Sequence, residues 1–298
     1  MFYGSITALV TPFKDNEIDW DSFENLVERQ IASGTHALVP CGTTGESPTL
    51  SHEEHMRLVE RCVNITQKRV PVIAGTGSNS TKEAIYLTEH AKSAGADAAL
   101  VVTPYYNKPT QDGLYAHYKA INDAVDIPII IYNIPGRCVI EMNVETMAEL
   151  AKLKNIVGVK DATNDLSRVK KTLDAIGPDF CQLSGEDPTI YEFLKEGGHG
   201  CISVTSNVAP ELCATLHEKW RADDHAAAHA LHERLSPLHE ALFVESSPQP
   251  VKYALSRLGL CTDEVRLPLI PASAHARQTV DAAMEKAGIA TETASQVA

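Results

Sequence analysis

Short apolar segments rich in β-branched residues recur along the chain as far as residue 204, and amphipathic helical patterns separate them. Each segment is apolar throughout rather than alternating, which is typical of parallel strands covered on both faces. We expect eight strands, at residues 6–10, 37–40, 71–74, 98–102, 128–132, 156–160, 180–184 and 201–204. Eight strands that alternate with helices predict a (β/α)8 barrel of the TIM type.

Beyond residue 207 only helical periodicity remains. Four helices are expected there, near residues 210–221, 224–243, 248–258 and 273–287. The first would close the barrel as its eighth helix. We therefore predict a barrel domain at residues 1–222 and a small helical appendage at residues 223–298, whose polar end from residue 291 is expected to be disordered.

Two helix starts in the barrel have the spacing of a capping box, in which a serine and a glutamate three residues later satisfy each other's backbone N–H groups. The pairs are Ser51 with Glu54, and Ser80 with Glu83. Both would begin helices that follow predicted strands.

The composition excludes several classes of protein. A formal net charge of −13, without a compensating basic stripe, argues against nucleic acid as a partner. No run of 18 apolar residues and no secretory signal pattern is present, so we expect a cytoplasmic protein without a membrane partner. The 7 cysteines are odd in number and contain no Cys-x-x-Cys pair, which predicts reduced thiols.

The most informative residue is Lys160, at the end of the apolar segment 156–160. Burial lowers the pKa of a lysine, and the neutral amine attacks carbonyl groups, so Schiff-base catalysis is the leading hypothesis. The structural alternative is a lysine whose stem follows the strand while its ammonium group reaches water or pairs with Asp161. Neighbouring strand ends favour the catalytic interpretation.

Those strand ends carry further polar groups, and catalytic residues of (β/α)8 barrels lie at this end of the strands. The turn Cys41-Gly42-Thr43-Thr44-Gly45-Glu46-Ser47 is suited to holding a small carboxylate by backbone N–H groups and hydroxyls. Tyr132 is a candidate general acid and base, with Thr43 and Tyr106 extending a hydroxyl chain towards solvent. Arg137 is placed to bind a carboxylate in a fork. Weaker candidates are Gly185, for close backbone approach, and Ile202, for packing on a methyl group.

Three motifs together resemble those of the dihydrodipicolinate synthase family, and the resemblance extends from Phe2 to about Ile289. They are Gly42-Thr43-Thr44-Gly45-Glu46-Ser47, Tyr132-Asn133-Ile134-Pro135-Gly136-Arg137 and Val157-Gly158-Val159-Lys160-Asp161-Ala162-Thr163. The resemblance implies a homotetramer, a dimer of dimers, that condenses pyruvate with L-aspartate 4-semialdehyde on the route to diaminopimelate and lysine. It implies no metal and no organic cofactor.

By position, the resemblance makes Lys160 the residue that forms the imine with pyruvate. Thr43, Tyr132 and Tyr106 would form the proton relay, with Tyr106 donated across a subunit interface. Thr44 would hold the pyruvate carboxylate, and Arg137 would bind the carboxylate of the semialdehyde.

The resemblance also implies a second site, for L-lysine as a feedback inhibitor at the interface of a tight dimer. Its residues would be Ser47, Pro48, His52, His55, Asn79, Glu83 and Tyr105. Glu83 would face the ammonium group of the effector. Pro48 departs from the alanine that is frequent at this position, which leaves the geometry of the effector site open.

Three alternatives remain. Lys160, Tyr132 and the glycine-rich turn are also expected in other pyruvate-dependent lyases, such as N-acetylneuraminate lyase or a 2-keto-3-deoxy sugar-acid aldolase, whereas Arg137 and the tyrosine pair favour the synthase. A metal-dependent aldolase would need a ligand cluster, and the helical triplet His225, His229 and His232 is the candidate. A noncatalytic barrel would lack a catalytic residue, and none is missing.

Overall fold

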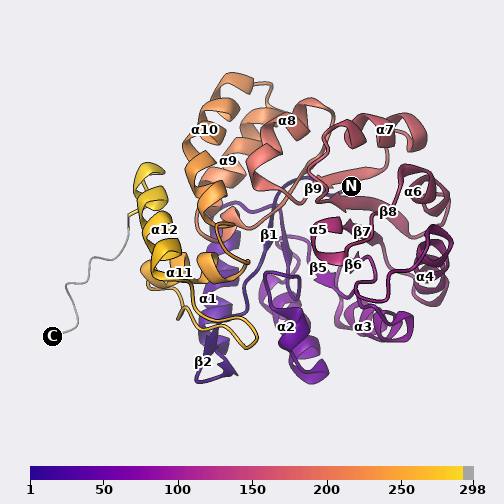
Figure 1. Ribbon diagram of the computed structural model, residues 1–298, viewed down its shortest axis with the longest axis horizontal. Coiled ribbons are helices and arrows are strands. Elements are labelled where there is room, and N and C mark those ends of the chain that lie inside the picture. Colours follow the sequence, from indigo (N-terminus) through magenta and orange to yellow (C-terminus); the bar gives the residue numbers. More distant parts are fainter. Residues whose placement is uncertain (291–298) are drawn as a thin grey trace.

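A barrel of eight parallel strands forms the centre of the computed structural model, which describes residues 1–290 (Figure 1). The strands are β1 (Gly4–Ala8), β4 (Ala37–Val39), β5 (Ile73–Gly75), β6 (Ala98–Val102), β7 (Ile129–Asn133), β8 (Ile156–Asp161), β9 (Cys181–Ser184) and β10 (Gly200–Ser203). They are neighbours in the order β4-β1-β10-β9-β8-β7-β6-β5. Backbone hydrogen bonds from Leu38 to Pro71 and from Gly75 to Pro40, both 3.0 Å, join β4 to β5. The predicted (β/α)8 barrel is confirmed.

Helices surround the strands on the outside of the barrel (Figure 1). They are α1 (Trp20–Ala32), α2 (His52–Thr66), α3 (Thr81–Ala94), α4 (Gln111–Ala124), α6 (Val144–Leu150), α7 (Ser167–Ile176), α8 (Ile190–Lys195) and α9 (Pro210–Arg221). The short helix α5 (Pro135–Cys138) instead lies over the ring of strands in this view (Figure 1). Each long helix buries an apolar stripe against the strands; α2, for example, packs Leu58 and Val59 into the same cluster as Leu38 and Val72. Strands covered in this way are apolar on both faces, as the sequence pattern indicated.

The chain ends in three further helices that form the appendage: α10 (His225–Ala241), α11 (Gln249–Arg257) and α12 (Ala274–Lys286). Their apolar residues, including Leu235, Val251 and Val280, share one core cluster with Val10 and Leu26 of the barrel. The appendage therefore packs on the barrel through a continuous core. The division near residue 222 stays a prediction, and residues 291–298, for which disorder was expected, lie outside the described residues.

The two predicted capping boxes have different outcomes. At α2 both reciprocal hydrogen bonds between Ser51 and Glu54 are present. Ser80 is the N-cap of α3, but its side chain makes no capping bond, so that capping box is wrong. The reason is that the Glu83 carboxylate instead accepts hydrogen bonds from Ser78 Oγ and pairs with His52.

A small hairpin of β2 (Phe13–Lys14) and β3 (Glu17–Ile18) escaped the sequence analysis. Its strands are too short to show any periodicity. The turn residues Asp15 and Asn16 both adopt positive φ, 55° and 64°, which a two-residue hairpin loop needs and which aspartate and asparagine tolerate. Helices α5 and α6 were missed for the same reason, because a helix of 4 or 7 residues spans at most two turns.

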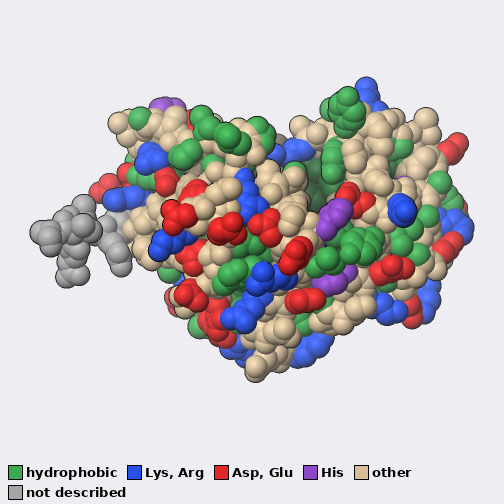
Figure 2. All heavy atoms as spheres, turned by 90° about the horizontal axis from the view of Figure 1, so that it is seen from below, with side chains coloured by type: hydrophobic (Ala, Val, Ile, Leu, Met, Phe, Trp, Pro, Cys, Tyr) green, Lys and Arg blue, Asp and Glu red, His purple; other side chains and the backbone are tan. Residues whose placement is uncertain are grey.

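The surface and the thiols agree with the composition. Lys and Arg side chains are interspersed with Asp and Glu on the face drawn in Figure 2 and do not gather in one basic area. All 7 cysteines are unpaired, and six of them are buried. Within residues 1–290, no helix is both long and apolar enough to cross a membrane.

Candidate active site

Lys160 and Tyr132 lie side by side at the carboxyl ends of β8 and β7. They are partners in the parallel register of these strands, and Lys160 Nζ is 4.1 Å from the centre of the Tyr132 ring. Each residue is only 6% exposed. A buried amine beside a phenol thus occupies the end of the barrel where the sequence analysis placed it.

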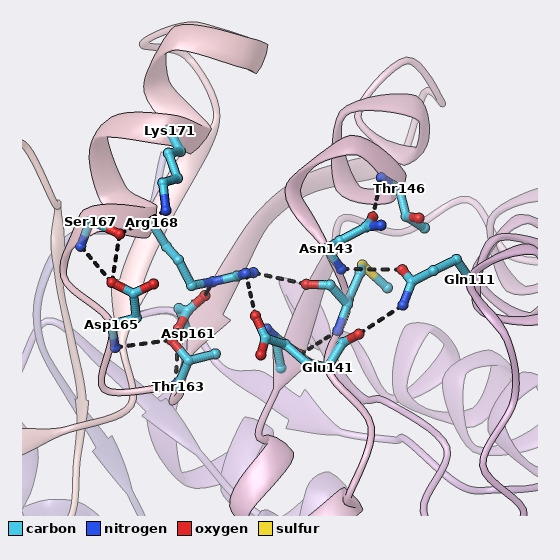
Figure 3. Close-up of polar contacts among 12 residues, drawn as sticks. Gln111, Glu141, Asn143, Thr146, Asp161, Thr163, Asp165, Ser167, Arg168 and Lys171 are labelled. Carbon is cyan, nitrogen blue, oxygen red and sulfur yellow. Dashed lines mark hydrogen bonds and ion pairs between the residues drawn. The ribbon is translucent and has the colours of Figure 1, made fainter.

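Asp161, the alternative partner of Lys160, is engaged elsewhere. Its carboxylate accepts a hydrogen bond from Arg168 Nε at 2.9 Å and from the backbone N–H of Thr163 at 3.0 Å (Figure 3). Because successive side chains of a strand point to opposite faces, Lys160 points into the barrel and Asp161 points towards the helices. The two side chains therefore do not form an ion pair, and at 6% exposure Lys160 does not extend into solvent as the structural alternative would have it.

Gly185 provides the space that the Lys160 side chain occupies. A Cβ atom at this position would lie 3.1 Å from Lys160 Cε and 2.7 Å from Ala162 Cβ. Ile202 on β10 is 1% exposed and belongs to the apolar cluster that also contains Tyr132. Both residues line the interior near the lysine, while their contacts with a substrate stay a prediction.

The glycine-rich turn after β4 is folded tightly. Gly45 and Glu46 donate backbone hydrogen bonds to Gly42 and Thr43, both at 3.1 Å, and Thr11 Oγ1 donates to the Gly45 carbonyl at 2.7 Å. Thr44 is buried, whereas Thr43 is partly exposed. The turn is therefore held in one conformation by its own backbone, as a rigid binding surface requires.

Arg137 lies on the short helix α5, directly after the strand that carries Tyr132. Its side chain is exposed and makes one long hydrogen bond, 3.4 Å, from Nη2 to the carbonyl of Ser247 in the segment before α11. The guanidinium group thus retains most of its donors for a ligand.

The tyrosine pair follows β6. Tyr106 adopts a positive φ of 68° and is 91% exposed, while Tyr105 is 36% exposed. A side chain this exposed does not pack against Lys160 of its own chain. The hydroxyl relay through Thr43, Tyr106 and Tyr132 stays a prediction.

A separate cavity of about 260 Å³ lies between α2, α3 and the segment after β6. Six of the seven predicted effector residues line it: Ser47, Pro48, His52, His55, Glu83 and Tyr105. Asn79 is not among the lining residues; its carbonyl accepts a hydrogen bond from the Asn107 side chain at 2.8 Å.

The cavity contains a preformed set of polar groups. His52 Nε2 lies 2.7 Å from Glu83 Oε1, and hydrogen bonds from Ser78 and His52 hold the pKa of Glu83 below its ordinary value. Burial lowers the pKa of His55 to about 4, so its ring is neutral at pH 7. Its Nε2 donates to the Gly75 carbonyl at 2.8 Å, and its Nδ1 is buried without a partner within residues 1–290.

Glu186, directly after Gly185, was not chosen as a site residue from the sequence. Burial raises the pKa of Glu186, and the positive charges of Lys160 and Arg137 oppose part of that rise. Its position after a strand end was the signal that pointed to it.

The helical histidine triplet does not form a metal site. Among the described residues, no group of three or more His, Cys, Asp or Glu side chains is arranged to hold a metal ion. His229 instead packs edge-on against Tyr191, with ring centres 4.8 Å apart, and His225 packs against Trp220 at 4.3 Å.

Comparison with known families decides what kind of barrel this is. The model of the dihydrodipicolinate synthetase family matches residues 1–287. The chain belongs to this family. A 4-hydroxy-tetrahydrodipicolinate synthase of Rhodospirillum centenum is 64% identical over 291 residues, covering 98% of this chain and 100% of the relative.

Solved structures of the same family have the same fold. A chloride-inhibited dihydrodipicolinate synthase from Acinetobacter baumannii, complexed with pyruvate, has a TM-score of 0.95 and 48% identity, covering 97% of this chain and 100% of that chain. An enzyme of the family from Cyanidioschyzon merolae with lysine bound has a TM-score of 0.94 and 40% identity, covering 97% and 99%. This dihydrodipicolinate synthetase family member is therefore an enzyme of the class expected from the resemblance, and the comparisons do not favour the sialic-acid lyase or sugar-acid aldolase alternatives.

Proposed function

We propose that the chain condenses pyruvate with L-aspartate 4-semialdehyde through an imine on Lys160. The observation that carries the proposal is the buried Lys160 beside Tyr132 at the carboxyl ends of adjacent barrel strands. Relatives of 56–64% identity that bear the name 4-hydroxy-tetrahydrodipicolinate synthase support it.

In the first half of the reaction, the neutral Lys160 amine attacks the keto carbon of pyruvate. The resulting carbinolamine loses water to give the imine, and Tyr132 relays the proton with Thr43 and Tyr106. Thr44 and the neighbouring backbone N–H groups hold the pyruvate carboxylate.

In the second half, the imine loses a methyl proton and becomes an enamine, whose carbon attacks the aldehyde of the second substrate. Arg137 binds the carboxylate of that substrate in its fork of donors. The substrate amine then displaces Lys160 and closes the ring, which regenerates the lysine. The imine nitrogen accepts the electrons that leave the carbon–hydrogen bond, so the proposed reaction needs no metal and no organic cofactor.

Trapping by borohydride tests the imine. Reduction in the presence of pyruvate is expected to leave one stable adduct on Lys160, located by intact mass and peptide mapping. Lys252 is a control within the same chain, because it is also buried but forms an ion pair with Glu46, and it should remain unmodified. Absence of an adduct, or an adduct on another lysine, contradicts the mechanism.

We further propose that L-lysine binds in the cavity beside His55 and Glu83 and inhibits the enzyme. The cavity shares structure with the site: Ser47 ends the turn that contains Thr44, and Tyr105 precedes Tyr106. An effector that moves either segment would alter the proposed relay. The proposal includes a cytoplasmic homotetramer, since the tyrosine pair of one chain is expected to complete the site of its neighbour.

Initial rates measure this inhibition. Millimolar L-lysine should slow wild-type turnover, and Glu83→Gln should lose the inhibition while retaining activity, because the neutral amide attracts the effector's ammonium group less. Ser78 and His52 contact Glu83 and allow the amide to remain in place. If L-lysine does not change the initial rate of the wild type, the proposal that the cavity binds an inhibitory lysine is wrong.

A further inference from the structure

A group of polar contacts outside the barrel interior joins the two strands that carry Tyr132 and Lys160. We call it the strand-end brace and define it by Asn133, Glu141, Met142, Asp161 and Arg168. Arg168, on α7, is its centre and is only 6% exposed. None of these residues belongs to the proposed substrate contacts.

Arg168 uses three of its nitrogens in three different contacts (Figure 3). Nε donates to Asp161 at 2.9 Å, Nη1 donates to Glu141 at 2.6 Å, and Nη2 donates to the Met142 carbonyl at 2.9 Å. Asp161 is the last residue of β8 and follows Lys160 directly. Arg168 therefore ties the end of the lysine strand to residues 141–142.

The neighbouring strand is tied to the same segment. Asn133, the last residue of β7, is fully buried, and its side-chain oxygen accepts a hydrogen bond from the Met142 N–H at 3.0 Å. In the strand register Asn133 is the partner of Asp161, one residue beyond the pair of Tyr132 and Lys160. The residue after each reactive side chain is thus anchored to one short segment.

That segment also follows the helix of Arg137. Val139, which ends α5, has a positive φ of 67°, a strained conformation for a β-branched residue that persists only where its surroundings fix it. Gln111 of α4 secures the segment from the other side, donating to the Glu141 carbonyl at 2.8 Å and accepting from the Asn143 N–H at 3.2 Å (Figure 3).

We propose that Arg168 is a positioning residue of the reaction: through the strand-end brace it sets Lys160 against Tyr132 and holds the segment behind Arg137. This inference rests on the proposed function of Lys160. Lysine cannot replace arginine here, because one ammonium group does not reach three partners in the fixed directions of a guanidinium group. A displacement of about 1 Å at a reacting group costs on the order of a hundredfold in rate.

The brace members should differ in importance. Asp161 and Arg168 are both largely shielded, with side chains 12% and 8% exposed, so loss of one leaves the other's charge poorly compensated. Glu141 is 50% exposed, and water replaces its contribution. We therefore expect Arg168→Met and Arg168→Lys to have large effects and Glu141→Gln a small one.

The experiment measures how fast the pyruvate imine forms, by quenching with borohydride at successive times and recording intact mass. Arg168→Met and Arg168→Lys should form the Lys160 adduct on the order of tenfold to a hundredfold more slowly than wild type, at temperatures where melting curves show them folded. Arg277→Met is the matched control. It removes an arginine that contacts Asp263 and the Ala272 carbonyl in the appendage, and it should form the adduct at the wild-type rate.

A purely structural arginine would lower the melting temperature and leave the rate of adduct formation in the folded protein unchanged, and that result overturns the inference. If Arg168→Met does not fold, Asp161→Asn carries the same test. The two carboxylate oxygens of Asp161 accept from Thr163 and from Arg168 separately, and an amide has a single acceptor oxygen, so one of these contacts is lost. Adduct formation by Asp161→Asn at the wild-type rate also overturns it. Failure of the wild type itself to form an adduct contradicts the proposed function instead.

Discussion

Lys160 is positioned by the residues that surround it. Its Nζ atom lies over the Tyr132 ring, and the missing side chain at Gly185 leaves room for its methylene groups. The amine of Lys160 is thus placed by packing rather than by the adjacent Asp161. The sequence alone predicted Lys160 and Tyr132, because a lysine and a tyrosine at the ends of apolar segments are readily recognised. It did not predict the brace, because Glu141 and Arg168 are 27 residues apart in the chain.

A methyl group at Gly185 tests this positioning. Gly185→Ala would place its Cβ 2.7 Å from Ala162 Cβ and 3.1 Å from Lys160 Cε, so the lysine or the strand must move. We expect a loss of stability of about 1–3 kcal/mol and adduct formation on Lys160 slowed by at least about tenfold. Urea unfolding and the timed borohydride assay measure the two effects.

Gly136→Ala is the matched substitution for stability, because its added Cβ would have no atom within 4 Å. It should unfold at the wild-type urea concentration. If Gly185→Ala forms the Lys160 adduct at the wild-type rate, the position of Lys160 does not depend on the absence of a side chain at residue 185.

At the scale of elements, a buried ion pair fastens the appendage to the turn that is expected to bind pyruvate. Lys252 on α11 pairs with Glu46, and the two side chains are 0% and 1% exposed. Lys252 also donates to the Glu264 carbonyl at 2.7 Å and lies 4.1 Å from the centre of the Phe13 ring. Glu46 directly follows Gly45, so the position of the glycine-rich turn depends on a helix near the other end of the chain.

Removing one partner of the Lys252–Glu46 pair should destabilise the protein by more than the intact pair stabilises it. Lys252→Met or Glu46→Gln alone should lower the free energy of unfolding by about 3–5 kcal/mol, because each leaves a buried polar or charged group without its partner. The double variant should lose less than the sum of the two. Denaturant unfolding of the three variants gives these values.

Lys170→Met serves as the comparison, since it removes an exposed ion pair with Asp174 on α7 and should change stability by less than about 0.5 kcal/mol. Losses that simply add in the double variant would show that Lys252 and Glu46 do not act as a pair.

At the scale of the whole molecule, exposed tyrosines lie where the proposed function expects contact with a neighbouring chain. Tyr106 is 91% exposed and Tyr86 is 47% exposed, and both lie on segments that border the effector cavity. Side chains of this kind are frequent in interfaces between subunits. The proposed relay requires a neighbouring chain to supply Tyr106.

Mixed oligomers test that requirement. Tyr106→Phe and Lys160→Ala should each be nearly inactive, with Tyr106→Phe as stable as the wild type, because an exposed hydroxyl contributes little to folding. A site in a mixed dimer that combines Lys160 from the first variant with Tyr106 from the second should recover activity. Coexpressed and separately purified variants are compared in the same turnover assay, and a mixture no more active than its parts contradicts donation between chains.

Acid should destabilise the molecule through buried histidines. Burial lowers the pKa of His55, His117 and His239 to about 4 and that of His217 to about 3, from an ordinary value of 6.5. The unfolded chain therefore binds protons that the folded chain does not, and the free energy of unfolding falls as pH drops from about 6.5 towards 4. One such histidine contributes about 2 kcal/mol of this loss at pH 5.

His117→Gln isolates one contribution, since its partner Thr81 can still make a hydrogen bond at this position. The variant should lose less stability than the wild type between pH 7 and pH 5, measured by urea unfolding. His229→Gln, at a half-exposed position, should keep the wild-type pH dependence. If the free energy of unfolding falls equally with pH in all three proteins, His117 does not contribute to the loss of stability in acid.

The sequence by itself determined the eight strands and the four terminal helices, and it predicted Lys160 as the reactive lysine. Periodicity and strand-end chemistry are local properties, so they are readable in short segments. Only the tertiary structure decided which strand ends meet, that Arg168 braces two of them, that Lys252 reaches Glu46, and that Tyr106 faces outwards. These contacts join residues up to 206 positions apart, and they form only when the sheet closes and brings distant segments to one end of the barrel.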